Sequence, residues 1–149
     1  MEAVIFIGIQ ASGKTTFYRK RFFDTHVRLS MDMLKTRHRE RLLIDACIRA
    51  RQSFVVDNTN VLRRQRAEYI LRAHDGGFHV AGYFFVPQVR QAIAWNRLRS
   101  GKAGIPVKGL LGTLKRLERP GPEEGFDHLY TVHVDKAGEF MVEAWKPPA

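Results

Sequence analysis

The residues with the clearest chemical meaning lie close to the N-terminus. Residues 8–15 have the spacing G-x-x-x-x-G-K-T, which is the pattern of a phosphate-binding loop. The apolar residues 3–7 precede this loop with the length of a strand, and residues 16–23 can form a helix after it. A strand, a glycine-containing loop and a helix in this order form the context in which such loops bind phosphate. The sequence therefore predicts a nucleoside triphosphate site.

Each residue type in the loop suits phosphate chemistry. Glycines let the backbone turn its N–H groups toward phosphate oxygens, and the start of the next helix adds partial positive charge. In such a loop the lysine, here Lys14, reaches the β- and γ-phosphates, and the hydroxyl of Thr15 binds Mg²⁺. ATP and Mg²⁺ are therefore the expected donor and metal. The predicted nucleotide contacts are Gly8, Ala11, Ser12, Gly13, Lys14, Thr15 and Thr16.

A carboxylate follows the second apolar segment of the chain. Residues 27–29 are expected to form a short strand, and Asp32 is the only carboxylate in the loop after it. A kinase that phosphorylates an alcohol needs a base or an orienting group for that hydroxyl. Asp32 is the candidate for this role. The alternative is that Asp32 only caps the following helix.

Four polar residues lie at and just after the end of the third apolar segment, residues 53–57. They read Asp57, Asn58, Thr59 and Asn60. An aspartate that closes an apolar strand is typical of the residue that supports Mg²⁺ in phosphate-loop enzymes. We therefore expect Asp57 at the metal and this polar group at the substrate, with ordinary turn chemistry as the alternative.

Two arginines, Arg97 and Arg99, end a predicted helix. Small residues follow them at positions 100–104. We expect residues 97–105 to form a lid whose arginines neutralise charge on the transferring phosphoryl group. The alternative is a basic helix end that is favourable to the helix dipole.

The polar positions lie between apolar segments that alternate with helical patterns. This alternation predicts an α/β fold of three layers, with a mainly parallel central sheet of about five strands, helices on both faces and a small lid. Ligands of such sheets bind at the carboxyl ends of the strands. Strands are expected at residues 3–7, 27–29, 53–57, 79–86 and 130–134, with a sixth at 140–145 as a hairpin partner, and helices at 16–23, 34–50, 63–74, 89–99 and 106–117. In the second helix, Leu42, Leu43, Ala46, Cys47 and Ala50 are expected on one face.

Length and composition indicate one domain over residues 1–149. The net charge of +10 and the pI of about 10.3 favour a polyanionic partner, with a solvated basic helix face as the alternative. The single cysteine, Cys47, is expected to be a buried thiol, which fits a reducing cytoplasm. No apolar stretch has the length of a membrane span and no signal peptide is recognised, so we expect a cytoplasmic protein.

Taken together, these motifs resemble the polynucleotide 5′-hydroxyl kinase domain of the P-loop kinase superfamily. The resemblance covers nearly the whole chain and implies transfer of the ATP γ-phosphate to a 5′-OH end of DNA or RNA, with Mg²⁺. It further implies Asp32 as general base, Arg97 and Arg99 as lid arginines, and an acceptor or metal role for Asp57 and Asn58. The segments that carry it are residues 8–15, Asp32, residues 57–60, Asn96-Arg97-x-Arg99, Ile105-Pro106 and residues 122–126.

Some positions depart from the pattern of that family. Lys35 stands where an acceptor-phosphate arginine often follows the catalytic aspartate, and Arg37 lies nearby to compensate. No D-x-D-G-T phosphatase string occurs, so we expect a kinase alone, with any phosphatase or ligase supplied by a separate partner. The predicted acceptor contacts are Asp32, Lys35, Arg37, Asp57, Asn58 and Asn60.

Two other functions remain open from the sequence. One is a P-loop kinase that phosphorylates a hydroxyl of a sugar, a nucleoside or an antibiotic, which needs the same Lys14, Thr15 and Asp32. The other is a non-catalytic, nucleotide-dependent module that binds nucleic acid. A GTPase is not favoured because no N-K-x-D guanine motif is present.

Overall fold

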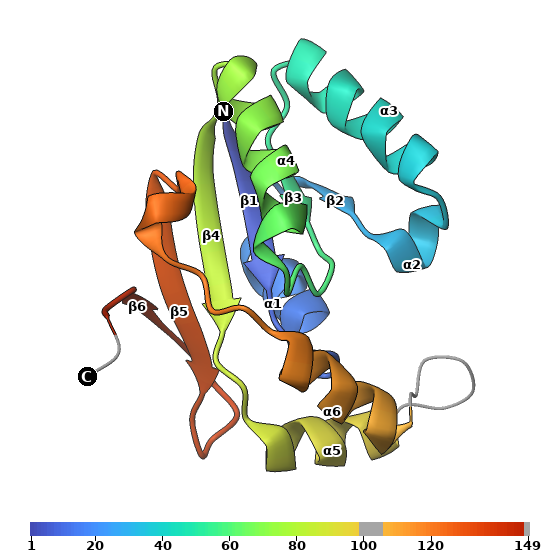
Figure 1. The fold of residues 1–149 in the computed structure, drawn as a ribbon, viewed down its shortest axis with the longest axis vertical. Helices are drawn as coiled ribbons and strands as arrows, with labels where there is room; N and C mark the ends of the chain where they lie inside the picture. Colours follow the sequence, from blue (N-terminus) through green and yellow to red (C-terminus); the bar gives the residue numbers. More distant parts are fainter. Residues whose placement is uncertain (99–105, 148–149) are drawn as a thin grey trace.

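One six-stranded sheet forms the centre of the protein (Figure 1). The computed structural model describes residues 1–98 and 106–147. The strands are β1 (Glu2–Ile7), β2 (Val27–Leu29), β3 (Phe54–Val56), β4 (His79–Phe85), β5 (His128–Val134) and β6 (Phe140–Ala144). Their order is β2-β3-β1-β4-β5-β6, and all neighbours are parallel except β5 and β6. The expected antiparallel sixth strand is therefore confirmed, next to five parallel strands.

Helices cover both faces of this sheet. Those after α1 (Lys14–Arg21) are α2 (Met31–Leu34), α3 (Arg37–Arg49), α4 (Arg63–Asp75), α5 (Val89–Leu98), α6 (Val107–Arg116) and the 3₁₀ turn η2 (Pro122–Glu124). In Figure 1, α3 and α4 lie on the near face, whereas α1 lies on the far face, and α5 and α6 lie at the end where β1 and β4 finish. The predicted three-layer α/β fold is confirmed. No helix within the described ranges has the length and apolar character needed to cross a bilayer.

The strand sequences are apolar throughout because both sheet faces are covered. Along β1, Ala3, Ile5 and Ile7 join the core under α3 and α4, whereas Val4 and Phe6 join the core under α1. A smaller core cluster joins Ile9 and Ala11 of the phosphate loop to Ala92 of α5 and Leu110 of α6. The loop that follows β1 is thus supported by two helices that come much later in the chain.

The helix expected over residues 34–50 is interrupted, so that prediction is wrong in its start and in its buried face. Lys35 has a φ of 71°, which ends α2, and the Thr36 hydroxyl caps α3 by accepting from the Arg39 N–H at 3.2 Å. The buried residues of α3 are Glu40, Ile44 and Cys47, spaced four and three apart, whereas Leu42 and Leu43 are 55% and 39% exposed. Cys47 is buried, as expected.

Arg66 of α4 is completely buried, although arginine is usually a surface residue. Its Nε donates to Glu124 of η2 at 2.8 Å, and its Nη1 and Nη2 donate to the carbonyls of Asn60 and Glu118 at 2.9 and 3.0 Å. These contacts connect α4 to the loop after β3 and to the segment after α6. Arg66 therefore stabilises the fold instead of adding to the surface charge.

Candidate functional site

The phosphate loop occupies the turn between β1 and α1, and its two motif glycines are required by geometry. Gly13 has a φ of 91°, a conformation that favours glycine. A Cβ at Gly8 would lie 2.9 Å from the Cβ of Phe85. The Gly8 N–H also donates to the Thr59 carbonyl at 2.9 Å, which joins the loop to the one after β3.

Two polar side chains of the loop are arranged for a phosphate ligand. The Lys14 side chain is buried, and its Nζ donates to the carbonyls of Gly8 and Ile9 at 3.1 and 2.7 Å. The Oγ of Ser12 is buried and has no hydrogen-bond partner among the described residues. Buried hydroxyls normally have a partner, and a phosphate oxygen at the start of α1 would supply one.

The residues predicted to hold Mg²⁺ lie together. The Thr15 hydroxyl, in the first turn of α1, donates at 3.1 Å to Oδ2 of Asp57, which directly follows β3. A hydroxyl and a carboxylate are the hard oxygen groups that Mg²⁺ prefers, and triphosphate oxygens supply ligands in such sites. No cluster of three or more His, Cys, Asp or Glu residues in residues 1–98 and 106–147 could hold a metal. The donor set therefore fits Mg²⁺ held jointly with a nucleotide.

Arg28 also belongs to this group, although no sequence motif pointed to it. Its Nε donates to Oδ2 of Asp57 at 2.7 Å, and its Nη2 donates to the Thr15 hydroxyl at 3.3 Å. The Asp57 side chain is only 2% exposed, so this guanidinium compensates a buried carboxylate. The signal available in the sequence was a single charge inside the short apolar segment Val27–Leu29.

Asp32 lies in the first turn of α2, at the carboxyl end of β2. The N-cap position of this helix is held by Ser30, so Asp32 is not its N-cap residue. The Asp32 side chain is exposed, and the N–H of its neighbour Met31 donates to Oδ1 of Asn58 at 2.9 Å. The strands β2 and β3 are adjacent, which brings Asp32 and the residues after β3 to the same edge of the sheet.

Two of the other predicted acceptor residues, Asn60 and Arg37, make hydrogen bonds within the protein. Asn60 is buried, and its Nδ2 donates to the carbonyls of Phe6 and Val56 at 2.8 and 3.5 Å, so it bridges β1 and β3. The Nη1 of Arg37 donates to Glu40 and to the Tyr69 hydroxyl at 3.0 and 2.8 Å. Lys35 is exposed between α2 and α3.

The predicted lid lies mostly outside the described residues. Arg97 is exposed near the end of α5. Arg99 and the rest of the segment 99–105 are not described. The lid assignment of both arginines therefore stays a prediction.

A pocket with aromatic walls lies beside the phosphate loop. It has a volume of about 270 Å³. A Cβ at Gly13 would come within 3.0 Å of Phe140 and 3.1 Å of Trp95, so both rings lie directly against the loop. Flat apolar walls next to a phosphate site could hold the purine of a nucleotide by stacking. No sequence motif predicted this pocket, which is lined by Thr16, Lys20, Trp95, Leu98, Gly138 and Phe140.

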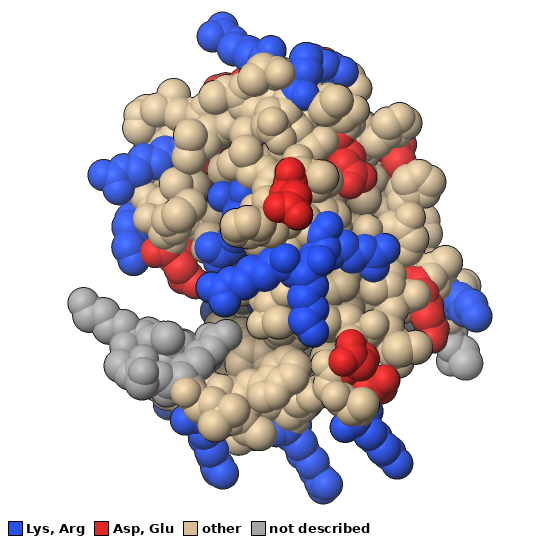
Figure 2. All heavy atoms as spheres, turned by 180° about the vertical axis from the view of Figure 1, so that it is seen from behind, with Lys and Arg blue, Asp and Glu red and all other residues tan. Residues whose placement is uncertain are grey.

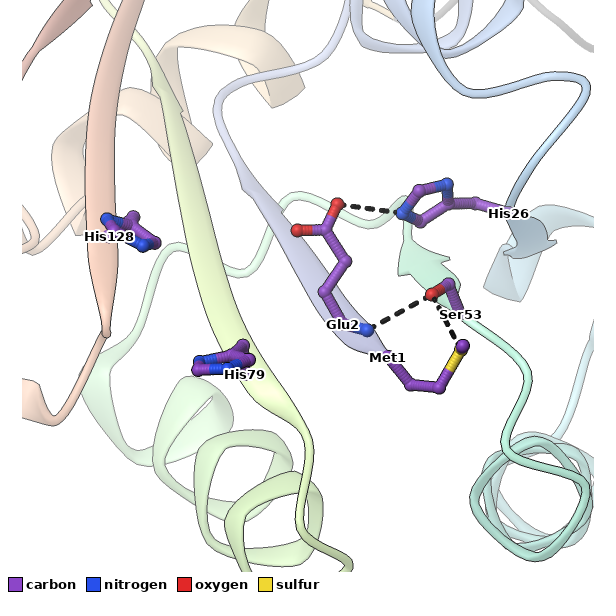
Figure 3. Close-up of a pocket in the computed structure, with 6 residues that line it drawn as sticks. All are labelled: Met1, Glu2, His26, Ser53, His79 and His128. Atoms are coloured by element: carbon purple, nitrogen blue, oxygen red, sulfur yellow. Dashed lines mark hydrogen bonds and ion pairs between the residues drawn. The ribbon is translucent and has the colours of Figure 1, made fainter.

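A second hollow, of about 430 Å³, lies at the opposite end of the strands (Figure 3). Glu2 Oε1 contacts Nε2 of His26 at 2.8 Å, and this hydrogen bond lowers the pKa of the Glu2 carboxyl. His79 and His128 lie on β4 and β5, apart from that pair in Figure 3. The histidines therefore line a surface hollow remote from the phosphate loop, and we assign them no chemistry.

Comparisons with known proteins agree with this architecture. Residues 4–120 match the AAA_33 family, described as an AAA domain. Chaetomium thermophilum Kti12, solved in complex with ADP-AlF3, superposes with a TM-score of 0.70 at 17% identity over 91% of this chain and 92% of that chain. A Janibacter sp. HTCC2649 sugar kinase gives 0.67 at 18% identity over 89% and 85%. A Sinorhizobium meliloti gluconokinase gives 0.61 at 19% identity over 89% and 82%. At these identities the neighbours show a shared P-loop kinase-like fold.

Proposed function

The chain belongs to the AAA_33 family of AAA domains, and from this premise we propose that it is an ATP-dependent phosphotransferase acting on a hydroxyl group of a small molecule. The observation that carries the proposal is the convergence of three groups at one sheet edge. These are the phosphate loop with Lys14, the Thr15–Asp57 pair and the exposed carboxylate of Asp32. This arrangement can hold a triphosphate and also present a base to an acceptor.

In this reaction each group of residues has a separate role. The loop N–H groups and Lys14 hold the β- and γ-phosphates, and the rings of Trp95 and Phe140 hold the base. Thr15 and Asp57 would hold Mg²⁺, which neutralises phosphate charge when it is bound. Asp32 accepts the proton of the acceptor hydroxyl as that oxygen bonds to the γ-phosphorus and the bond to the leaving ADP oxygen breaks. Arg97 and Arg99 stabilise the charge of the transferring group from the lid.

A small acceptor is favoured over a polynucleotide because several arginines form ion pairs within the protein. Figure 2 shows Lys and Arg side chains across the middle of the face opposite that of Figure 1. Several other arginines are engaged with carboxylates: Arg37 with Glu40, Arg66 with Glu124 and Arg72 with Asp45. Such pairing reduces the charge available for phosphates on the side of α3 and α4. The sugar kinase and gluconokinase among the structural neighbours support the same choice.

A polynucleotide 5′-hydroxyl end remains the second candidate acceptor, because the net charge is +10. The motifs that resemble polynucleotide kinases do not distinguish a polynucleotide acceptor from a small one. Asn60 bridges two strands and Glu124 pairs with buried Arg66. Both residues therefore serve the scaffold, which any acceptor would require.

An acceptor panel tests the proposal directly. The protein is incubated with γ-labelled ATP and Mg²⁺ at low salt, with sugars, gluconate, nucleosides and 5′-OH DNA and RNA oligonucleotides as separate acceptors. We expect label on a small acceptor, and none with Lys14→Ala. Label on oligonucleotides alone would support the second candidate. The KM of the oligonucleotide should then rise with salt, with a log–log slope of about +0.7 per phosphate contacted, because the association constant falls with the opposite slope. ATP binding without any transfer would favour a non-catalytic module.

A further inference from the structure

Glu40 of α3 has no part in the chemistry described above, although it is a buried carboxylate. We propose that Glu40 is a positioning residue that orients the Asn58 amide and, through it, the short helix α2 that carries Asp32. This inference rests on the proposed function, in which Asp32 acts on the acceptor. Glu40 contacts Asn58, and Asn58 contacts Met31, which directly precedes Asp32.

The Glu40 carboxylate is surrounded by donors from different parts of the chain. Its side chain is 3% exposed. Oε2 accepts from Nδ2 of Asn58 at 3.0 Å, and Oε1 accepts from the Tyr69 hydroxyl at 2.9 Å and from Nη1 of Arg37 at 3.0 Å. A buried carboxylate is costly unless it is paired and hydrogen-bonded. These donors come from α3 itself, from α4 and from the loop after β3.

Tyr69 is held as a donor in this cluster. Burial and the neighbouring Glu40 raise the pKa of the Tyr69 hydroxyl. It therefore keeps its proton at any pH at which a kinase would work. Both oxygens of Glu40 thus face fixed donors, and the side chain has a single arrangement that satisfies them all.

Glu40 decides which way the Asn58 amide points. An amide has a donor end and an acceptor end. Because the carboxylate accepts from Nδ2, Oδ1 must face the other way, where it accepts from the Met31 N–H at 2.9 Å. A reversed amide would place NH₂ against N–H at one end and oxygen against carboxylate at the other. Both contacts would be repulsive.

Helix α2 depends on this contact because it cannot support itself. It has four residues, whereas isolated helices below about 12–15 residues are marginal in water. The first N–H groups of a helix have no partner within it, and the side chain of the N-cap Ser30 makes no capping hydrogen bond. Asn58 therefore supplies, from the loop after β3, the acceptor for the Met31 N–H. Asp32 is the next residue.

The test is Glu40→Gln in the full chain. A glutamine can accept at only one of its two ends, so Asn58 or the Tyr69–Arg37 pair must lose an acceptor. We expect kcat to fall about 10- to 100-fold, the cost of a small misplacement of a reacting group. The Kd of ATP should stay within about twofold, because ATP contacts the phosphate loop and not α2.

Hydrogen exchange of the Met31 amide, followed by NMR, gives a readout independent of catalysis. In Glu40→Gln its protection should fall by about five- to tenfold, the size of one lost hydrogen bond. Asn58→Ala removes the acceptor itself and should have at least the same effect. The double variant should be no worse than Asn58→Ala in kcat, because both changes act through one contact.

Glu124→Gln is the matched control. It also weakens a buried arginine–carboxylate pair that involves α4, but Glu124 lies on η2, where its carboxylate accepts from Arg66 and from the Gly121 N–H. It should lower the unfolding midpoint while leaving kcat and Met31 protection near the wild-type values. A purely structural role for Glu40 predicts that the two variants behave alike.

The outcomes are distinct. Wild-type protection of Met31 in Glu40→Gln, or a kcat loss no greater than in Glu124→Gln, would overturn the positioning role. If Glu40→Gln does not fold, Asn58→Ala decides instead, and unchanged Met31 protection there would overturn the proposal. If the wild-type protein phosphorylates no acceptor, the proposed function fails, whereas the exchange of Met31 still reports whether Glu40 holds α2.

Discussion

At the scale of single residues, most polar side chains of the site already have hydrogen-bond partners within the protein. Asp57 is held by Thr15 and Arg28, and Lys14 donates to two loop carbonyls. Ser12 is the loop hydroxyl that has no partner among the described residues. Substitutions of Lys14 or Ser12 should therefore affect mainly ligand binding, whereas loss of Arg28 would also destabilise the fold by leaving the buried Asp57 carboxylate without its charge partner.

Lys14→Met should lower phosphoryl transfer by about 10²–10³-fold or more, because a donor to the transferring phosphate is lost. Methionine fills the same buried space, so the thermal midpoint should change little. Steady-state rates and circular dichroism melts measure the two effects. Wild-type turnover would exclude the role of the loop in catalysis.

Asp32→Asn should lower kcat by about 10²-fold or more, because the amide cannot accept the proton of the acceptor. The side chain is exposed and lies on α2, so the Kd of ATP should not change. Single-turnover rates and a fluorescent nucleotide titration check this. Turnover within about threefold of wild type would mean that another group is the base.

Cys47 should react slowly with thiol reagents in the native protein. Burial raises the pKa of its thiol, so less thiolate is present at a given pH. The contribution of this protonated thiol to the free energy of unfolding is complete below the unfolded-state pKa. It is lost as the pH rises through the folded-state pKa. Iodoacetamide labelling at pH 8 with and without urea tests this. Equal rates in both conditions would contradict it.

At the scale of elements, the break between α2 and α3 separates the candidate base from the long helix behind it. Lys35 provides the break by adopting φ 71° and ψ −34°. The Thr36 cap then restarts the chain as α3. This arrangement lets α2 turn toward the loop after β3, while α3 packs on the core through Ile44 and Cys47.

Lys35→Gly should be more stable than Lys35→Ala by about 1 kcal/mol, because only alanine keeps the steric cost of a positive φ. Both variants remove the same charge, so any loss of acceptor affinity should be equal in the two. Urea denaturation gives the stabilities, and KM values give the acceptor effect. Equal or reversed stabilities would mean that Lys35 leaves this conformation readily.

At the scale of the whole molecule, buried ion pairs join segments that are far apart in the sequence. Arg66 and Glu124 are the clearest example, since their side chains are 0% and 7% exposed. The pair connects α4 to η2, and the same guanidinium reaches the carbonyls of Asn60 and Glu118. The pair therefore fixes the segments after β3 and after α6 against α4.

Arg66→Met should reduce the free energy of unfolding by about 3–5 kcal/mol, because it leaves the Glu124 carboxylate buried without its charge partner. Denaturant titrations of the wild type and the variant measure this loss. Arg63→Met, which removes a more exposed arginine beside Glu123, should cost less than about 1 kcal/mol. Similar losses in the two variants would contradict the assigned role of Arg66.

The sequence by itself determined the parts of this protein whose geometry depends on neighbours in the chain. The phosphate loop is one, because its glycines, Lys14 and Thr15 act at fixed local spacing. The strands are another, since a strand buried on both faces must be apolar along its length. The same reasoning placed Asp32 and Asp57 at strand ends, and therefore at one edge of a parallel sheet.

Only the tertiary structure decided which side chains meet. Arg28 with Asp57, Glu40 with Asn58 and Arg66 with Glu124 are separated by 29, 18 and 58 positions in the sequence. Their contacts follow from the strand order β2-β3-β1-β4-β5-β6, which local patterns do not encode. Helical periodicity also could not show that Glu40 is buried and Leu42 exposed, because paired charges can be buried while apolar residues stay at the surface.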